Sequence, residues 1–256
     1  MKIATWNVNS LNVRRSHLRD WLATAAPDIV ALQETKMEDV KFPIDEVREL
    51  GYHCVFSGQK TYNGVAILAR SELSDIVTDI PDLADPQRRI LAASVGPLRI
   101  VNLYVVNGQA VGSEKYAYKL DWLSKVRNFV QDELTRHPRM IVLGDFNIAP
   151  EDRDVHDPEA WREQILCSTP EREALRNLLS LGLHDSFRFF EEGAGHFSWW
   201  DYRQAAFRRN LGLRIDLILA SEALRERCRS VTIDRIPRTW ERPSDHTPVI
   251  LELADE

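Results

Sequence analysis

The chain has 256 residues, of which 44% are hydrophobic and 28% charged, a composition typical of a globular protein with a substantial core. Its three cysteines, Cys54, Cys167 and Cys228, are far apart and include no C-x-x-C pair, which argues against a disulfide framework and a zinc cluster. The polar N-terminus argues against a signal peptide, and no apolar run is long enough to cross a bilayer. We therefore expect a cytoplasmic protein without membrane contact.

Nucleic-acid binding by a chain of net charge −6 requires a local concentration of positive charge, because phosphate contacts supply much of the affinity. The basic residues that could form such a patch are Arg88, Arg89, Lys115, Lys119, Arg208, Arg209 and Arg214. They could equally be scattered, solvated charges. Charge alone neither establishes nor excludes a nucleic-acid partner.

Short apolar runs rich in β-branched residues predict strands along the whole chain. In chain order these runs are 2–8, 29–33, 64–69, 90–95, 98–106, 140–148, 215–220, 231–236 and 248–253. Helical spacing of apolar residues predicts helices at 12–25 and 114–136, and Thr169-Pro170 predicts a third helix with Thr169 as N-cap and its end at Gly182. No linker or repeat interrupts this pattern. We expect an α/β (α+β) protein with mixed sheets, folded as a single domain over residues 1–256.

Polar residues interrupt or end five of the predicted strands, in the segments WNVN at 6–9, LQET at 32–35, LGDFN at 143–147, RIDL at 214–217 and SDHTPV at 244–249. Because side chains alternate along a strand, Asn7 and Asn9 are expected on one face, as are Asp145 and Asn147. One such residue is commonly explained by a strand-end turn. Five in one chain indicate strand ends that meet in a single polar pocket.

This set of side chains favours one reaction class. Carboxylate and amide oxygens are ligands for Mg²⁺ or Mn²⁺, and the lack of a Cys/His cluster disfavours zinc. Asn, Tyr and His supply donors for a phosphate whose charge grows during attack, and a further carboxylate can activate water. The sequence therefore predicts phosphodiester hydrolysis. It contains no P-loop, no G-x-G-x-x-G and no G-x-S-x-G motif that would support a competing chemistry.

The chain resembles the exonuclease III family of class II abasic-site endonucleases, within the endonuclease/exonuclease/phosphatase superfamily. The resemblance runs from end to end through WNVNSL at 6–11, LQETK at 32–36, YNGVAI at 62–67, DPQRRI at 85–90, GDFNIAP at 144–150, FSWWDYR at 197–203, GLRIDLILAS at 212–221 and SDHTPV at 244–249. The GDFN and SDH motifs mark the superfamily, whereas LQETK, WWDYR and GLRID are specific to its DNA-repair branch. The resemblance implies a four-layered sandwich of two mixed β-sheets packed face to face, with helices on both outer faces.

The resemblance also implies a role for each matching polar residue. Glu34 would be the principal metal ligand, and Asp145 would position or activate the attacking water. The metal and its phosphate would be lined by Asn7, Glu34, Asp145, Asn147 and Asp245. The phosphate and its developing charge would be held by Asn7, Tyr104, Asn147 and His246. Asp216 would orient His246 and favour its cationic form, since a nearby carboxylate raises the pKa of a histidine.

Further matching residues would contact DNA. Trp199, Leu213 and Ile215 match an apolar pocket that receives a flipped, base-less sugar, which is cheap to extrude because little stacking is lost. Ordinary core packing is the alternative interpretation of these three. Arg89 and Asn107 fall where relatives contact backbone phosphate. The segment 164–168 is expected near the pocket, where its side chains either open it or block it.

Two positions depart from the family pattern. Val106 replaces a proline that follows the tyrosine in many relatives, which bears on the rigidity of that loop. Asn9 stands where some relatives have aspartate, which bears on metal affinity or a second metal.

The leading hypothesis is a monomeric, Mg²⁺-dependent DNA-repair hydrolase, with Mn²⁺ able to substitute, that acts on double-stranded DNA with abasic or 3′-blocked sites. It would be an abasic-site endonuclease, a 3′-phosphodiesterase/phosphatase and a 3′-to-5′ exonuclease. One alternative is a superfamily phosphatase for small phosphate esters, and the repair-branch motifs argue against it. The other is a non-catalytic nucleic-acid-binding module, and the filled pocket positions argue against it.

Overall fold

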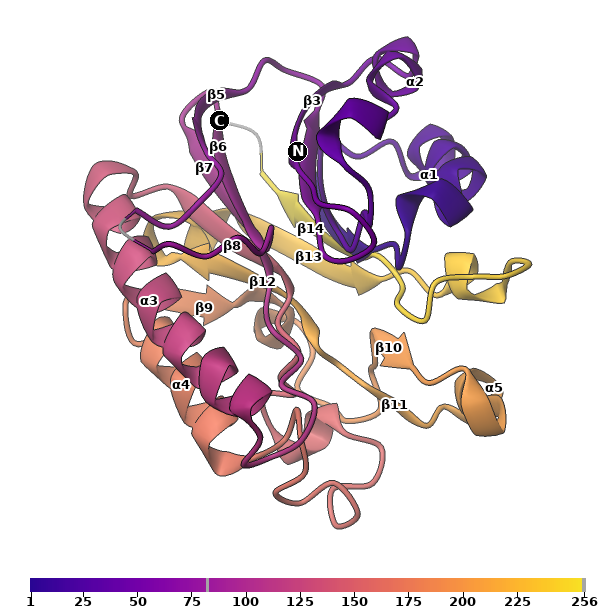
Figure 1. Ribbon diagram of the computed structural model, residues 1–256, viewed down its shortest axis with the longest axis vertical. Helices are drawn as coiled ribbons and strands as arrows, with labels where there is room; N and C mark the ends of the chain where they lie inside the picture. Colours follow the sequence, from indigo (N-terminus) through magenta and orange to yellow (C-terminus); the bar gives the residue numbers. More distant parts are fainter. Residues whose placement is uncertain (82, 255–256) are drawn as a thin grey trace.

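Two six-stranded mixed sheets form the centre of the computed structural model, which describes residues 1–81 and 83–254 (Figure 1). The first sheet has the order β13-β14-β1-β2-β4-β3 and consists of β1 (Lys2–Asn7), β2 (Ile29–Gln33), β3 (His53–Ser57), β4 (Val65–Ala69), β13 (Cys228–Ile233) and β14 (Val249–Leu253). The second has the order β5-β6-β7-β8-β12-β9 and consists of β5 (Ser74–Val77), β6 (Ile90–Val95), β7 (Leu98–Tyr104), β8 (Met140–Asp145), β9 (Leu183–Asp185) and β12 (Asp216–Ser221). β1 pairs with β2 and β7 with β8 in parallel, whereas the other pairings are antiparallel.

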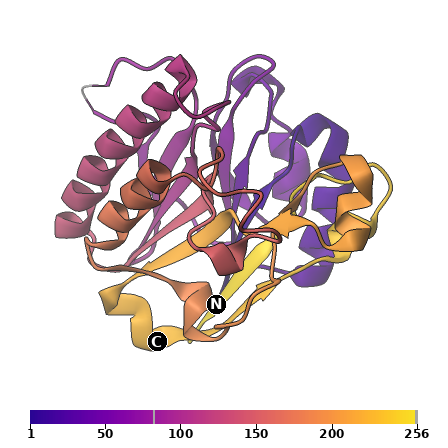
Figure 2. The same cartoon turned by 90° about the horizontal axis from the view of Figure 1, so that it is seen from below.

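Helices cover the outer face of each sheet (Figure 2). The α-helices are α1 (Leu11–Ala25), α2 (Ile44–Glu49), α3 (Glu114–Arg136), α4 (Thr169–Leu179) and α5 (Ala206–Arg209). Short 3₁₀ helices span Asp39–Lys41, Asp152–Asp154, Ser186–Phe189, Arg203–Ala205, Glu222–Arg227 and Ile236–Thr239. A two-stranded ribbon of β10 (Trp199–Trp200) and β11 (Gly212–Leu213) extends from the sandwich beside α5. The predicted four-layered sandwich is confirmed.

Strand alternation explains why the sheets have a core on each face. Ile29 and Ala31 of β2 belong to the core between the sheets, whereas Val30 and Leu32 belong to the core under α1 and α2. In the second sheet, Ile141 points to the central core, and its neighbours on β8 pack toward α3 and α4. A strand buried on both faces is a nearly continuous apolar run, and this is the pattern that predicted β2, β4, β6, β7 and β8.

A small network of hydrogen bonds crosses the central core. The amide of Gln33 at the end of β2 donates to Thr5 Oγ1 at 2.9 Å and to Asn102 Oδ1 of β7 at 2.8 Å. Asn102 in turn donates to the backbone oxygens of Leu32 and Ala66, both in the first sheet. All of these groups are buried, so this network fixes how the sheets lie against each other just beside the ends of β2 and β7.

The sequence predicted most of these elements, with corrections at their ends. Helix α3 and strands β2 and β6 have the predicted bounds, but the strands predicted to reach 106 and 148 end at Tyr104 and Asp145. The N-cap of α4 is Ser168 and not Thr169, because Ser168 forms a capping box with Glu171. Strands β3, β5, β9, β10 and β11 and helices α2 and α5 were not predicted, since they are short or lack a continuous apolar pattern.

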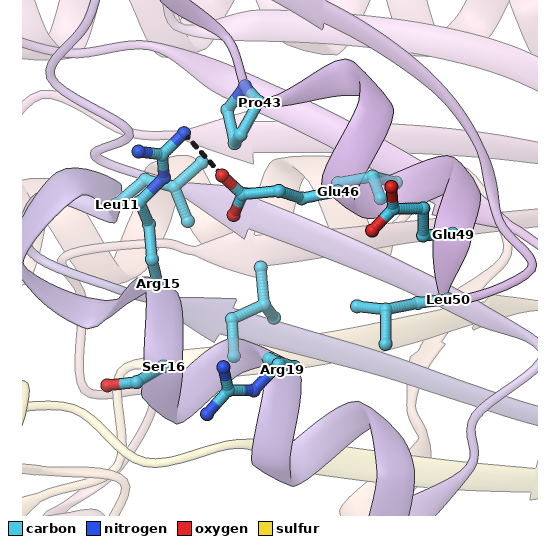
Figure 3. A pocket seen from close by; sticks show the side chains of 10 residues that line it. Leu11, Arg15, Ser16, Arg19, Pro43, Glu46, Glu49 and Leu50 are labelled. Atoms are coloured by element: carbon cyan, nitrogen blue, oxygen red, sulfur yellow. Dashed lines mark ion pairs between the residues drawn. The ribbon is translucent and has the colours of Figure 1, made fainter.

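A pocket lies between α1 and α2, in the helical layer that covers the first sheet (Figure 3). Its volume is about 400 Å³, its floor includes Leu11, Leu18 and Val47, and the ion pair of Arg15 with Glu46 at 3.0 Å crosses it. None of the residues predicted for the functional site lines this pocket. Among the described helices, none has the length and apolar character needed to cross a membrane.

Candidate active site

Strand register brings the predicted polar residues to one edge of the sandwich. In the second sheet Tyr104 pairs with Asp145, and Asp145 pairs with Asp216, so three functional side chains stand in a row across β7, β8 and β12. In the first sheet Asn7 ends β1, and Glu34 follows β2 immediately. The two sheets pack with these ends together. The predicted convergence of distant strand ends is therefore present in the fold.

Asn7 joins the contributions of the two sheets. Its amide nitrogen donates to Glu34 Oε1 and to Asp145 Oδ2, each at 2.9 Å. Because the amide is completely buried and both of its protons are used, the two carboxylates are held at a fixed separation. One ligand oxygen of Glu34, one of Asp145 and one ring nitrogen of His246 lie within 4.8 Å of one another.

His246 lies between two carboxylates. Its Nδ1 is 2.9 Å from Asp216 Oδ2, and its Nε2 is 3.7 Å from Asp145 Oδ2. Burial by itself would lower the pKa of His246, but Asp216 and Asp145 outweigh it and raise the pKa to about 10. Burial raises the pKa of Asp145 to about 7, against the opposing effect of His246. His246 is therefore a cationic donor at neutral pH.

Tyr104 ends β7 directly opposite Asp145. Burial raises the pKa of its hydroxyl well above the ordinary value, and the negative charges of Glu34 and Asp145 raise it further. The hydroxyl therefore stays protonated and can donate a hydrogen bond. The guanidinium of Arg89 lies 4.8 Å from the centre of the Tyr104 ring, a cation–π contact that joins a predicted phosphate-binding residue to the site.

Asn147 and Asn107 belong to adjacent loops whose side chains meet. Asn107 Nδ2 donates to Asn147 Oδ1 at 3.2 Å, and Asn147 Nδ2 donates to the Val105 carbonyl at 2.9 Å and to Asp145 Oδ2 at 3.3 Å. Asn147 has a φ of 47°, so the strand has ended before it. This places Asn147 at the site by a turn of the chain.

The prediction that strand alternation orients Asn9 and Asn147 was wrong. Both residues have positive φ and lie beyond their strands. Asn7 Oδ1 accepts from the backbone N–H of Asn9, and Asp145 Oδ1 accepts from that of Asn147, each at 2.9 Å. These are the local turns that Asn and Asp commonly make at strand ends. Asn7 and Asp145 use their other side-chain atoms, Nδ2 and Oδ2, for contacts within the site. Each residue therefore both forms a local turn and contributes to the site.

Asp245 lies outside the group formed by Glu34, Asp145 and His246. Its carboxylate accepts from Asn9 Nδ2 at 2.9 Å and from the Trp199 ring nitrogen at 3.0 Å. Lys36 was not singled out from the sequence, and its Nζ lies 2.7 Å from Asn9 Oδ1 and 2.8 Å from Glu34 Oε2. A chain of contacts thus connects Glu34 with Asp245 through a lysine and an asparagine.

Trp199, Leu213 and Ile215 come together in one apolar cluster next to the polar group. Trp199 pairs with Leu213 across the β10–β11 ribbon, and Leu213 and Ile215 are buried. The segment 164–168 was expected either to open or to block the pocket. Two of its side chains, Leu166 and Cys167, pack in the same apolar cluster. Leu166 has a φ of 73°, a backbone conformation that a branched side chain rarely adopts.

The donor set fits a hard divalent cation. Two carboxylates, of Glu34 and Asp145, are held by the amide of Asn7, and the Asn147 amide adjoins them. Oxygen ligands of this kind are those that Mg²⁺ prefers. The remaining member of the group, His246, has one ring nitrogen committed to Asp216 and carries a proton at neutral pH, so it is suited to donate a hydrogen bond.

Four of the basic residues named from the sequence fall into two groups. Lys119 and Arg214 are buried in ion pairs with Glu171 and Asp185 and do not form a surface patch. Arg89 and Lys115 instead line a cavity of about 800 Å³ beside the site, together with Tyr62, Asn63, Asp85, Gln87, Val106, Asn107, Gly108, Gln109 and Tyr118. Positive charge from Arg89 and Lys115 is therefore available in a cavity beside the site.

Ser198 is a second residue that the sequence reasoning missed. Its buried hydroxyl accepts from the backbone N–H of Ile215 at 3.1 Å and of Asp216 at 3.0 Å. The start of β12 is thereby attached to the segment that carries Trp199. Ser198 lies inside the FSWWDYR motif, which is the sequence signal that could have identified it.

Comparison with known proteins agrees with this geometry. The model of the endonuclease/exonuclease/phosphatase family matches residues 4–246. The chain is 36% identical to exodeoxyribonuclease III of Haemophilus influenzae, an alignment that covers 99% of this chain and 100% of that protein. The structure of the 3′ phosphatase NExo from Neisseria, bound to a product DNA hairpin, superimposes with a TM-score of 0.98 at 51% identity over 100% of both chains.

An AP endonuclease from Archaeoglobus fulgidus is also similar, with a TM-score of 0.95 and 38% identity over 99% of each chain. These relatives are nucleases or 3′-end-processing enzymes, and their similarity extends over the complete fold described above. The chain belongs to the endonuclease/exonuclease/phosphatase family and, within it, to the exodeoxyribonuclease III group of DNA-repair nucleases.

Proposed function

We propose that this protein is a Mg²⁺-dependent phosphodiesterase that acts as a monomer on double-stranded DNA with 3′-blocked or abasic sites. The observation that carries the proposal is the bridge of Asn7 between Glu34 and Asp145, with the cationic His246 beside them. This arrangement combines a metal-binding carboxylate, an acceptor for a water proton and a donor for phosphate oxygen. Metal-assisted hydrolysis of a phosphodiester uses all three.

Each side chain has a definite task in this proposal. Asp145 accepts the proton of the attacking water, since its raised pKa makes it a better base than an exposed aspartate. His246 and the hydroxyl of Tyr104 donate hydrogen bonds to phosphate oxygens as negative charge develops on them. Glu34, with Asp145 beside it, would hold Mg²⁺, which supplies charge stabilisation to the phosphate when bound.

The cavity beside the site is suited to the DNA backbone. Arg89 and Lys115 supply positive charge, and Asn107 supplies an amide donor, within its volume of about 800 Å³. Phosphate contacts of this type fix the position of a duplex without reading its sequence. The relatives described above support DNA as the polymer, since one of them was solved with a DNA hairpin product.

Within these activities, we propose that 3′-end processing exceeds abasic-site incision. An abasic endonuclease must accommodate an extruded sugar against an apolar surface. In this chain Leu166 and Cys167 pack with Leu213 and Ile215, which supports a filled pocket. A terminal 3′ phosphate needs no such extrusion, because it can enter the site from the end of a strand.

We also propose that residues 1–256 act as one catalytic domain in the cytoplasm. The site takes side chains from both sheets, so neither sheet would be active alone. The cysteines Cys54, Cys167 and Cys228 are free thiols, a state that a reducing compartment maintains.

Three labelled duplexes test the proposal: one with an internal abasic site, one with a nick carrying a 3′ phosphate, and one with an undamaged recessed end. Each is incubated with Mg²⁺, with Mn²⁺ and with chelator. We expect Mg²⁺-dependent turnover of all three, fastest on the 3′ phosphate. Turnover that persists in chelator, or faster release of phosphate from small esters than from DNA, would refute it.

A further inference from the structure

A lysine lies completely buried beneath the two loops that carry Asn107 and Asn147. Lys119 belongs to α3, where its side chain has no solvent exposure. Its ammonium donates to the backbone oxygen of Asn147 at 2.7 Å, to that of Asn107 at 3.1 Å and to the carboxylate of Glu171. An ammonium has three protons, and these three acceptors use all of them.

The carboxylate of Glu171 is equally committed. Besides Lys119, it accepts from the backbone N–H of Leu166 at 3.1 Å, and from the N–H and hydroxyl of Ser168 at 3.1 and 2.6 Å. Glu171 lies in the first turn of α4 and is also completely buried. The ion pair therefore connects α3, α4 and three loops: those around residues 107 and 147, and the segment 164–168.

These contacts restrain two parts of the site: the Asn107 and Asn147 loops relative to each other, and Leu166 relative to the apolar cluster. The side-chain amides of Asn107 and Asn147 hydrogen bond to each other, and their backbone oxygens share the Lys119 ammonium, so the two loops cannot separate without breaking both contacts. Leu166 is held on two sides, because its N–H donates to Glu171 and its carbonyl accepts from Ala149 at 2.8 Å. Its side chain is thereby fixed in the apolar cluster.

We propose that Lys119 and Glu171 form a positioning pair that places Asn147 and Asn107 at the phosphate and Leu166 in the apolar cluster, and so sets both the turnover rate and the preference between 3′ ends and abasic sites. The inference rests on the proposed function for its activity readouts. Neither residue touches the substrate. Each acts through the backbone of the loops that do.

The energetics of buried charge support a positioning role over a stabilising one. Removing two charges from water is costly, and their attraction in the interior commonly only offsets this cost. Replacing both by uncharged side chains of similar volume therefore costs less stability than removing either charge alone. It removes, however, the donor that holds the two loop carbonyls, and this loss is confined to the site.

The test is the double substitution Lys119→Met with Glu171→Gln, which removes both charges and approximately conserves volume. Its matched control is Arg99→Met with Glu133→Gln, because Arg99 and Glu133 form another buried ion pair, at 2.6 Å, which also involves α3. Glu133 is 14 residues along that helix from Lys119, or about 21 Å at the helical rise. If the double variant does not fold, Lys119→Gln with Glu171→Gln replaces it, because the two amides can hydrogen bond to each other and no buried charge is left unpaired.

We expect the Lys119/Glu171 variant to lose kcat for 3′-phosphate release by about a hundredfold, as misplacement of binding groups by 1 Å can do, with KM much less affected. The ratio of abasic incision to 3′-phosphate release should change as well. The Arg99/Glu133 control should keep the wild-type ratio and kcat. A folded Lys119/Glu171 variant with the kcat and ratio of the control would overturn the inference.

Hydrogen–deuterium exchange provides a readout that does not depend on activity. Loss of the pair should raise exchange at 105–109, 145–149 and 163–168 and leave the rest of the chain protected, whereas a purely stabilising pair would raise exchange throughout. If the wild-type protein proved inactive on DNA, the proposed function would fail. Exchange would still decide whether the pair positions these loops.

Discussion

Asp145 and Asp216 are directly paired residues on β8 and β12, and His246 contacts the carboxylates of both. Two buried carboxylates on adjacent strands would ordinarily repel each other and take up a proton. The imidazolium between them provides the compensating charge. The positive charge of His246 thus favours the deprotonated form of Asp145, which can act as a base toward water. The carboxylate of Asp216 in turn keeps His246 protonated.

Substitution Asp145→Asn should remove the acceptor for the water proton and retain the shape of the site. We expect kcat on a 3′-phosphate duplex to fall by about a thousandfold, within the range of general-base contributions. Binding of the duplex, measured by fluorescence anisotropy with Ca²⁺, should remain close to wild type. Asp121→Asn on the exposed face of α3 is the control, and a role for Asp145 would be excluded by turnover equal to that control.

The pH profile should report the charge of His246. Activity that needs the imidazolium is present below its pKa and is lost as pH rises through that value, which is about 10 in the wild-type protein. Asp216→Asn removes the largest contribution that raises this pKa, so the alkaline limb of log kcat/KM should move toward neutral pH. An alkaline limb at the same pH in both proteins would show that His246 is not the group that titrates.

Glu34 and Asp245 should differ in their effect on metal affinity. Glu34 belongs to the group of ligand atoms within 4.8 Å, whereas Asp245 lies outside that group. Glu34→Gln should therefore raise the Mg²⁺ concentration for half-maximal activity by more than about tenfold, and Asp245→Asn by less. Titration of nuclease activity with Mg²⁺ measures both, and a larger effect from Asp245→Asn would reverse the assignment.

Leu166→Gly should increase abasic-site incision. The substitution removes a side chain from the apolar cluster and relieves a left-handed backbone that costs a residue with a Cβ about 1–2 kcal/mol. We expect faster cleavage of an abasic duplex with little change in 3′-phosphate release, both measured under single-turnover conditions. Leu175→Ala, a buried position in the core under α3 and α4, is the control for general loosening, and equal gains in both variants would contradict a specific role.

The four-layered sandwich was implied by the family resemblance. From its residue pattern alone, the sequence predicted the central strands, because they are buried on both faces and are therefore unbroken apolar runs. It also predicted which residues meet, since Asn7, Glu34, Asp145 and His246 each stand at a strand end with no apolar role. Local rules failed where the chain turns: Asn9 and Asn147 adopt positive φ, and no periodicity reveals that. The partner of Lys119 was equally inaccessible, because Glu171 is distant in sequence and a lone lysine in an amphipathic helix is ordinarily on its surface.

The hydrogen bond of Gln33 with Asn102 has a consequence for thermal behaviour. Glu34 follows Gln33 immediately, and Tyr104 lies two residues after Asn102. If one sheet slipped over the other, the site residues of the first sheet would move away from those of the second. The strands within each sheet would nevertheless remain paired. Heating should then abolish catalysis at a lower temperature than it melts the β-structure seen by far-ultraviolet circular dichroism, and replacing both amides with leucine should widen that gap. Loss of activity and of ellipticity at one common temperature in the two proteins would show that the layers separate only on complete unfolding.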